Sequence, residues 1–280
     1  MNPLPSPIRL KMDRLGSLLA DLESAAVAFS GGVDSSLLLC MARGFLGERV
    51  VAVTARSEVT PRGDLDQAAR LAARLSVVHW VIESGETALE AFVNNGPDRC
   101  YLCKRERYNS LLDLLKRRGI ACLLDGSNAD DERDFRPGAR AVRELGVRTP
   151  LREVGLTKDE IRIAARHLGL DCWNRPSSPC LATRIPYGSR ITSRKLRQVE
   201  EAEEYLAGLR IARQVRVRHH GDLARIEVDE FSLPSLMEDS VRKRVVERLV
   251  ALGFTYVTLD LGGYRMGSLN RAIDERSYFG

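Results

Sequence analysis

The chain has 280 residues, of which 44% are hydrophobic and 29% charged, and its formal net charge is +5. This length suits one or two domains, and the apolar share is too high for a largely disordered chain. No apolar run approaches the roughly 18 residues that cross a bilayer, and the N-terminus lacks the apolar stretch of a secretory signal. We therefore expect a globular cytoplasmic protein, and the small positive excess alone does not indicate nucleic-acid binding.

Apolar runs alternate with amphipathic stretches over the first two-thirds of the chain. The runs predict strands at 25–29, 50–54, 77–82 and 121–125, and the stretches predict helices at 35–46, 64–75 and 104–118. This alternation is typical of βαβ units, which form a parallel sheet with helices on both faces. Ligands bind beyond the carboxyl ends of such strands, so we expect functional residues in the loops that follow them.

The pattern changes near residue 190. The elements predicted here are a helix at 191–209, strands at 214–218 and 224–229, a helix at 235–252 and a strand at 256–261. Thr192 is a candidate cap of the first helix, and a His-His-Gly-Asp turn joins the two strands into a hairpin. We therefore predict two domains, 1–189 with a parallel sheet and 190–280 with a small α+β fold.

The first strong motif lies between the first predicted strand and its helix. It reads SGGVDSS and consists of Ser30, Gly31, Gly32, Val33, Asp34, Ser35 and Ser36. Glycines let the backbone approach a ligand, and the first turn of a helix leaves N–H groups free for an anion. The motif lacks the lysine of a Walker A loop and matches the pyrophosphate loop (PP loop) of enzymes that split ATP between its α and β phosphates. We expect the loop and Mg²⁺ to stabilise the departing pyrophosphate.

A polar segment, DGSNADD, follows the fourth predicted strand at 125–131. It should lie at the same edge of the sheet as the PP loop. We expect Asp125, Ser127 and Asp131 to hold magnesium or to orient the nucleotide. A turn that simply favours Asp, Asn and Gly is the alternative.

Three of the six cysteines lie in polar segments marked by Gly or Pro. Cys100 and Cys103 form a CxxC pair in RCYLCK, and Cys180 lies in PSSPCLATRIPYG. These cysteines could instead be a redox pair, two thiolates of a zinc site or plain thiols in turns. No second CxxC or histidine pair completes a zinc site. Three cysteines from two loops can also bind three irons of a [4Fe–4S] cluster and leave the fourth iron open.

These three motifs, in this order and at these distances, resemble the LarE family of ATP-dependent sulfur transferases in nickel-pincer nucleotide biosynthesis. The resemblance runs from about residue 24 to the end and includes GVRTPLREVGLTK at 146–158 and GYRMGSLN at 263–270. The PP loop is shared with NAD, GMP and asparagine synthetases and with tRNA thiolases, so PSSPCLATRIPYG carries the family assignment. The resemblance implies a Rossmann-like PP-loop domain of the adenine nucleotide α-hydrolase type, followed by an α+β domain for substrate binding and oligomerisation.

The substrate in this family is pyridinium-3,5-biscarboxylic acid mononucleotide. The resemblance implies that ATP adenylylates a carboxylate with loss of pyrophosphate, and that sulfur then displaces AMP to form a thiocarboxylate. Members with only the cysteine that matches Cys180 sacrifice its sulfur and keep dehydroalanine. Members that also match Cys100 and Cys103 are understood to bind a [4Fe–4S] cluster with a transferable sulfide. Because this chain has all three, we predict the cluster route, with ATP, Mg²⁺ and the cluster as cofactors and a sulfide donor as partner.

The family's functional residues carry over to two regions by position. Asp34 and the PP-loop serines belong to the ATP site, with Asp34 and the three cysteines as catalytic residues. Substrate binding falls to Arg216 and Arg218, which alternate on one face of a strand, and to Glu227, Arg265 and Glu204. The register at Glu204 is open because EEAEE offers several glutamates, and a solvated hairpin face is the alternative for the arginines.

Two other functions compete with this prediction. A tRNA thiolase can combine the same loop with three cysteine ligands, although no RNA-binding domain accompanies the core here. A sensor that binds ATP or an iron–sulfur cluster without turnover is the second. The family resemblance further implies a homo-oligomer. From the apolar runs and the charge distribution we expect neither a membrane nor a nucleic acid as a partner. The resemblance also implies handover of the product to the nickel-insertion and carboxylase proteins of the pathway that matures lactate racemase.

Overall fold

The computed structural model describes residues 3–132, 137–176 and 178–265. The chain forms two compact units, one of residues 1–86 and 98–178 and the other of residues 87–97 and 179–280. The sequence predicted a single boundary near residue 189 and did not anticipate that Thr87–Pro97 belongs to the second unit. Among the described residues, no helix is both long enough and apolar enough to span a membrane.

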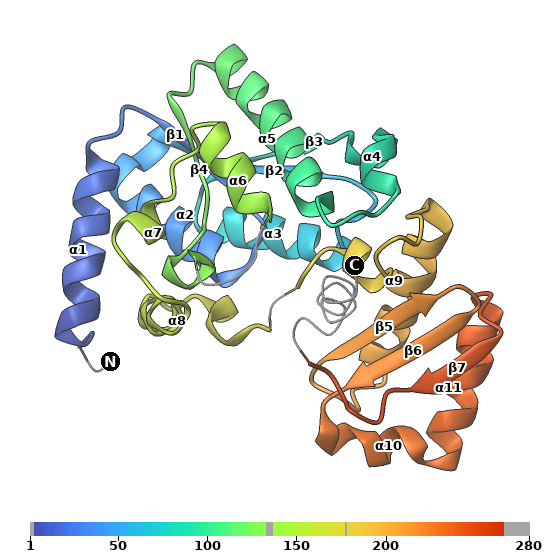
Figure 1. The fold of residues 1–280 in the computed structure, drawn as a ribbon. Coiled ribbons are helices and arrows are strands. Elements are labelled where there is room, and N and C mark those ends of the chain that lie inside the picture. The colour runs from blue at the N-terminus through green and yellow to red at the C-terminus, as the bar shows by residue number, and fades with distance from the viewer. Residues whose placement is uncertain (1–2, 133–136, 177, 266–280) are drawn as a thin grey trace. The chain divides into compact units, whose positions relative to one another are not determined.

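A parallel four-stranded sheet forms the centre of the first unit (Figure 1). The strand order is β3-β2-β1-β4 and every neighbouring pair is parallel. The strands are β1 (Ala25–Ala28), β2 (Val50–Arg56), β3 (Val78–Glu83) and β4 (Cys122–Leu124). All four lie where the apolar runs predicted them, and β1 and β4 end side by side because Val27 pairs with Leu124.

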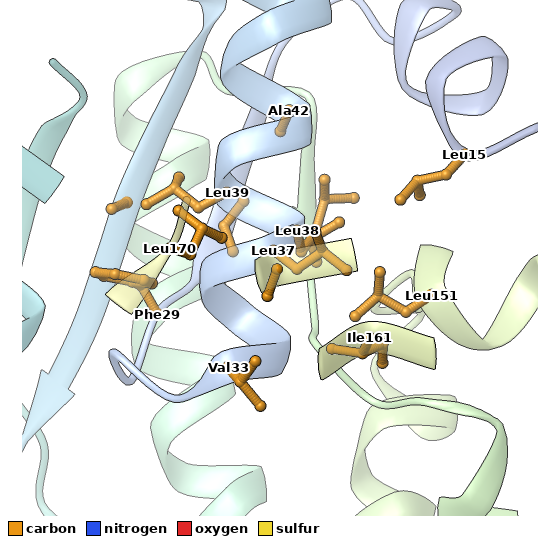
Figure 2. Packing of buried hydrophobic residues seen from close by; sticks show 14 of the residues in the cluster. Leu15, Phe29, Val33, Leu37, Leu38, Leu39, Ala42, Leu151, Ile161 and Leu170 are labelled. Carbon is orange, nitrogen blue, oxygen red and sulfur yellow. The ribbon is translucent and has the colours of Figure 1, made fainter. Parts of the chain in front are cut away.

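Helices cover both faces of this sheet, as predicted. One core joins the sheet to α1, α2, α3 and α8, and a second core joins its other face to α5 and α6. Side chains of α2, α1 and α8 converge in the first core, among them Leu37, Leu15 and Ile161 (Figure 2). The helices are α1 (Ser6–Ala20), α2 (Val33–Leu46), α3 (Arg62–Arg74), α5 (Arg99–Arg118), α6 (Pro137–Glu144), α7 (Pro150–Glu153) and α8 (Lys158–His167).

The second unit packs helices on a three-stranded sheet of order β5-β6-β7. Its elements are α4 (Glu90–Val93), α9 (Ser193–Gly208), β5 (Val215–His220), β6 (Leu223–Val228), α10 (Leu233–Met237), α11 (Asp239–Ala251) and β7 (Tyr256–Leu259). β5 and β6 form the predicted antiparallel hairpin, and β7 pairs with β6 in parallel. The hydroxyl of Thr192 accepts a hydrogen bond from the Lys195 N–H at the start of α9, which confirms the predicted cap.

Three predicted boundaries differ from the structure. The helix expected from residue 104 starts at Arg99, so the CxxC pair lies in a helix and not in a loop. His219 and His220 belong to β5 and not to the hairpin turn. The single helix expected over 235–252 is two helices that meet at Glu238, whose extended backbone (ψ 132°) interrupts the helical path.

A buried asparagine explains why Thr87–Pro97 packs in the second unit. Asn95 is fully buried, and its side-chain amide donates to the carbonyls of Ile185 (3.3 Å), Pro186 (2.8 Å) and Ser189 (2.9 Å). A buried amide is stable only when its hydrogen bonds are made. The contacts therefore hold the short segment against the chain that follows Cys180.

Short 3₁₀ helices complete the described chain. They cover Gly47–Arg49, Glu86–Ala88, Ala129–Glu132, Asp171–Asn174, Leu181–Arg184 and Glu230–Ser232.

Candidate functional site

The PP loop connects β1 to α2, as the sequence predicted. Ser30 and Ser35 lie together, since their hydroxyls are 3.2 Å apart and the N–H of Gly32 donates to the Ser30 hydroxyl at 3.3 Å. Gly32 is the N-cap of α2 and has no side chain to satisfy the first-turn N–H groups, which leaves them to an anion. Ser36 is fully buried, and its hydroxyl has no hydrogen-bond partner among the residues that the structure describes. Of the predicted loop serines, Ser30 and Ser35 therefore line the loop, whereas Ser36 lies inside the core.

Two glycines make the loop sterically possible. Gly31 has a φ of +71°, and a Cβ on it would lie 3.2 Å from the backbone of Ala68 in α3. Gly126, in the loop after β4, approaches the start of α2 so closely that a Cβ would lie 3.0 Å from the backbone nitrogen of Ser35. Side chains at either position would displace the backbone that surrounds the first turn of α2.

Asp34 joins the PP loop to the segment after β4 and to α8. One carboxylate oxygen accepts from the side-chain amide of Asn128 at 3.3 Å, and the other forms an ion pair with Lys158. The backbone N–H of Lys158 donates to Asp130 at 2.7 Å, and the N–H of Asn128 donates to Asp131 at 2.9 Å. The structure thus gathers carboxylates and one lysine beside the first turn of α2, from three segments that are distant in sequence.

Asp125 supports this segment from within. It is 6% exposed, lies 3.0 Å from the Lys104 amine, accepts from the Ser127 N–H at 2.8 Å and accepts from the Tyr108 hydroxyl. Burial alone would raise the pKa of Asp125, but Lys104 and the hydrogen bonds lower it to about 2. Burial and the nearby Asp125 charge raise the pKa of Tyr108, so its hydroxyl stays a neutral donor. Both carboxylate oxygens of Asp125 thus already have partners within the protein. Its role as a ligand of the nucleotide or of magnesium remains a prediction.

Cys100 and Cys103 lie in the first turns of α5. Both side chains are half-buried, and residues three apart on a helix share one face. α6 packs against these turns, since a Cβ on Gly138 would lie 3.2 Å from the Lys104 side chain and 3.5 Å from the Cys100 carbonyl. The start of a helix also favours negative charge, and therefore thiolates. The two thiols are suited to bind two irons, to occupy two coordination positions of another metal or to form a disulfide.

Some of the side chains present suit the metals that the family resemblance implies. Thiolates are the ligands of [4Fe–4S] clusters, and Cys100 and Cys103 fit two of them, while carboxylates such as Asp131 fit Mg²⁺. Within the part of the chain that the structure describes, no three His, Cys, Asp or Glu side chains gather into a group that could hold a metal ion.

Cys180 is a half-buried free thiol directly before the 3₁₀ helix Leu181–Arg184. Its carbonyl accepts from the Thr183 N–H at 3.0 Å and from the Thr183 hydroxyl at 2.7 Å. Within the second unit, this short helix lies against β5, because the Arg218 guanidinium donates to the Thr183 carbonyl at 2.9 Å. The cysteine loop and the predicted substrate arginines are therefore neighbours.

The predicted substrate residues form a buried charged layer on the hairpin. Arg218 is 6% exposed and donates to the fully buried Glu227 at 2.8 and 3.0 Å. Glu227 pairs with Arg216 across the strands, and Arg225 donates to its second oxygen at 3.0 Å. The Arg216 guanidinium lies 5.6 Å from the ring centre of Tyr264. Burial and the neighbouring Arg184 lower the pKa of Arg216, so an added anion would be stabilised beside it.

The other two predicted substrate residues are placed differently. Arg265 is exposed and is the last described residue, so the rest of GYRMGSLN lies outside the described part of the chain. Glu204 is exposed on α9, whereas its neighbour Glu203 binds Arg184 at 2.7 and 2.9 Å and accepts from the Val217 N–H at 2.9 Å. Of these two glutamates, Glu203 is the one that contacts the hairpin.

Comparison with known proteins identifies the family. A family model described as asparagine synthase matches residues 18–131, which contain the PP loop. The chain is 40% identical to pyridinium-3,5-bisthiocarboxylic acid mononucleotide synthase of Lactiplantibacillus plantarum, over 94% of this chain and 95% of that protein. The chain belongs to the LarE family. It is also 40% identical to an uncharacterised protein of Synechocystis, over 94% and 98% of the two chains.

More distant matches reflect the PP-loop domain that the LarE-family protein shares with other enzymes. It is 30% identical to GMP synthase of Aeropyrum pernix, over 64% of this chain and 38% of that protein. This LarE-family protein is accordingly an ATP-dependent sulfurtransferase of the PP-loop superfamily.

Two residues that contact predicted site residues were not themselves predicted. Lys158 forms an ion pair with Asp34 in the first unit, and its only sequence signal is its position at the start of a helix in GLTK. Arg184 lies in the family motif PSSPCLATRIPYG, but nothing in the local sequence shows that its guanidinium is 2% exposed.

Proposed function

We propose that this protein inserts sulfur into pyridinium-3,5-biscarboxylic acid mononucleotide in two steps. In the first, a substrate carboxylate oxygen bonds to the α-phosphorus of ATP, and pyrophosphate leaves. In the second, sulfur bonds to the acyl carbon of the adenylate, and AMP leaves with the electron pair of the C–O bond. The products are the thiocarboxylate, AMP and pyrophosphate, and no oxidant or reductant is consumed.

The first step would use the residues gathered at the start of α2. The N–H groups of the first turn and the Ser30 and Ser35 hydroxyls would bind the β,γ-phosphates. Lys158 would contribute positive charge to the same phosphates on leaving Asp34, whose carboxylate could then hold Mg²⁺ together with Asp131. We assign this chemistry to the PP-loop domain, predicted at 1–189, and substrate binding to the α+β domain, predicted at 190–280.

Substrate binding would use the arginines of the hairpin. Burial and the neighbouring Arg184 lower the pKa of Arg216 although Glu203 opposes this, and a phosphate or a carboxylate beside Arg216 would stabilise its charged form. Arg218 is held by Glu227 and would present a fixed guanidinium edge. A pyridinium nucleotide carries both kinds of anion.

Cys100, Cys103 and Cys180 would hold a [4Fe–4S] cluster, and the presence of all three supports this route over sacrifice of the Cys180 sulfur. When bound, the cluster would supply a transferable sulfide. The family resemblance further suggests a homo-oligomer that passes its product to the nickel-inserting step of the pathway. The near full-length similarity to the L. plantarum synthase carries the whole proposal.

Anaerobic purification with measurement of iron, sulfide and the electronic spectrum tests the sulfur source. We expect Cys100→Ala, Cys103→Ala and Cys180→Ala to lose the cluster singly, while Cys122→Ala, a half-buried thiol of β4, keeps it. Pyrophosphate release that depends on the pyridinium substrate tests the activity itself.

Other outcomes would point to other functions. Full thiolation by Cys100→Ala with conversion of Cys180 to dehydroalanine would support the sacrificial route. Thiolation of tRNA without activity on the pyridinium nucleotide would indicate a tRNA thiolase, and ATP binding without pyrophosphate release would indicate a sensor.

A further inference from the structure

A single buried guanidinium holds the backbone on both sides of Cys180. Arg184 is 2% exposed, and its Nη1 donates to the carbonyl of Pro179 at 2.6 Å and to the carbonyl of Cys180 at 3.1 Å. The same nitrogen lies 2.9 Å from the hydroxyl of Thr183, which itself bonds to the Cys180 carbonyl. Both peptide groups that flank the cysteine are thus fixed by one side chain.

The opposite edge of the Arg184 guanidinium is fixed as well. Its Nε and Nη2 donate to the two oxygens of Glu203 in α9, at 2.9 and 2.7 Å. Glu203 also accepts from the backbone N–H of Val217 at the edge of β5, at 2.9 Å. Burial opposes the charge of Arg184, but the paired Glu203 raises the pKa of Arg184 above its ordinary value. The guanidinium is therefore a permanent cation whose planar fork joins a helix, a strand and the cysteine loop.

The cysteine loop also contacts the arginine that is predicted to bind substrate. Arg218 donates to the Thr183 carbonyl at 2.9 Å and, through its other nitrogens, to the buried Glu227. Two Arg–Glu pairs thus meet at Thr183, one of which orients Cys180 and the other of which presents the substrate arginine. A buried ion pair contributes little net stability compared with apolar packing, so its value here lies in fixed geometry.

We propose that Arg184, oriented by Glu203, is a positioning residue that fixes Cys180 relative to the anion-binding arginines of the hairpin. The proposal rests on the proposed function in that Cys180 is taken to act in the sulfur-transfer step. Misplacement of a reacting group by about 1 Å can cost roughly 100-fold in rate. The sulfur-transfer step therefore benefits from a loop whose two peptide groups beside Cys180 are both held in place. The adenylation step does not use Cys180 and should not depend on Arg184.

The first test measures the reactivity of Cys180 without any substrate. The metal-free protein is alkylated with iodoacetamide, and the peptides that contain Cys180 and Cys100 are quantified over time by mass spectrometry. In Arg184→Lys, which keeps the charge but loses the fork, we expect Cys180 to react at least about fivefold faster, with Cys100 unchanged. Glu203→Gln should change Cys180 in the same direction, and it serves as the second variant if Arg184→Lys fails to fold. Arg190→Lys is the matched control, because it removes the guanidinium fork from an exposed Arg–Glu pair with Glu90 in the same unit.

The second test separates positioning from general stability. In single-turnover assays, Arg184→Lys should lower the rate of sulfur transfer at least about tenfold, while the rate and KM of ATP-dependent pyrophosphate release change less than about twofold. An unchanged Cys180 alkylation rate in both variants, or an equal loss of both steps, would overturn the proposal. If the wild-type protein released pyrophosphate but never thiolated the substrate, the proposed function would fail, whereas the alkylation rates would still decide whether Arg184 holds the cysteine loop.

Discussion

Replacement of Asp125 by asparagine should destabilise the first unit by about 2 kcal/mol at neutral pH. The variant keeps the shape of the side chain and its hydrogen bond from the Ser127 N–H, but it removes the charge that faces Lys104. The contact joins the CxxC helix α5 to the segment that follows β4. Both the stability of the unit and the order of its nucleotide loop therefore depend on it.

The magnitude follows from the pKa of the carboxyl group. Burial raises it, but the attraction of Lys104 and the hydrogen bonds of Ser127 and Tyr108 lower it from 3.8 to about 2. That preference for the charged form corresponds to about 2 kcal/mol of folding free energy. Lys104 is 28% exposed and can regain water in the variant, so the cost should stay below the roughly 3–5 kcal/mol of a fully buried pair that loses one partner.

Urea unfolding followed by the fluorescence of Trp80 and Trp173, both in the first unit, measures this cost. Because the folded pKa is depressed, the stabilisation is complete above the unfolded value of 3.8 and is lost as the pH falls toward 2. The difference between wild type and Asp125→Asn should thus be constant at neutral and mildly acidic pH and should shrink once the pH falls below 3.8. Asp113→Asn, on the exposed side of the same helix, is the control and should change little.

The reasoning would be refuted by a cost below about 0.5 kcal/mol, which is within the range of an ordinary surface substitution. A cost that does not change with pH would refute it as well, since the charge would then not be its source. We also expect a higher KM for ATP in pyrophosphate release, because the segment from Ser127 to Asp131 borders the first turn of α2.

Three further predictions concern the same framework. Gly31→Ala should abolish substrate-dependent pyrophosphate release, because its Cβ would press on Ala68, whereas Gly146→Ala carries similar backbone strain (φ +65°) in open space and should retain activity. Lys158→Met should raise the KM for ATP at least about tenfold, because the PP loop would lose the α8 lysine that pairs with Asp34, whereas an unchanged KM would exclude a phosphate contact. Burial, with smaller effects of neighbouring charges, lowers the pKa of His219 from 6.5 to about 4. Only the unfolded chain binds this proton between those values, so the free energy of unfolding should fall by up to about 3 kcal/mol as the pH drops from 6.5 to 4, and His219→Gln should flatten that loss in urea titrations followed by circular dichroism.

The local pattern of the sequence determined the elements of the first unit and the position of the PP loop. The spacing of apolar residues within a short segment predicts strands and amphipathic helices. The glycine-rich turn between them can be predicted from its own few residues as well. The CxxC pair shows where this reading fails. Its segment is polar and no side chain caps the helix, yet α5 begins at Arg99 because α6 and buried residues such as Tyr101 stabilise its first turns.

Other parts of the site were decided only by the tertiary structure. Lys158 reaches Asp34 across 124 residues, and Asn95 draws its segment into the second unit through carbonyls about 90 residues away. Glu203 rather than Glu204 meets Arg184 because each helical residue turns the side chain by about 100°, so only the packing of α9 against β5 selects one of two adjacent glutamates. Ion pairs and buried hydrogen bonds between distant segments leave no local pattern in the sequence. The family motifs do leave one, because each keeps its backbone geometry and reactive groups within a few neighbouring residues.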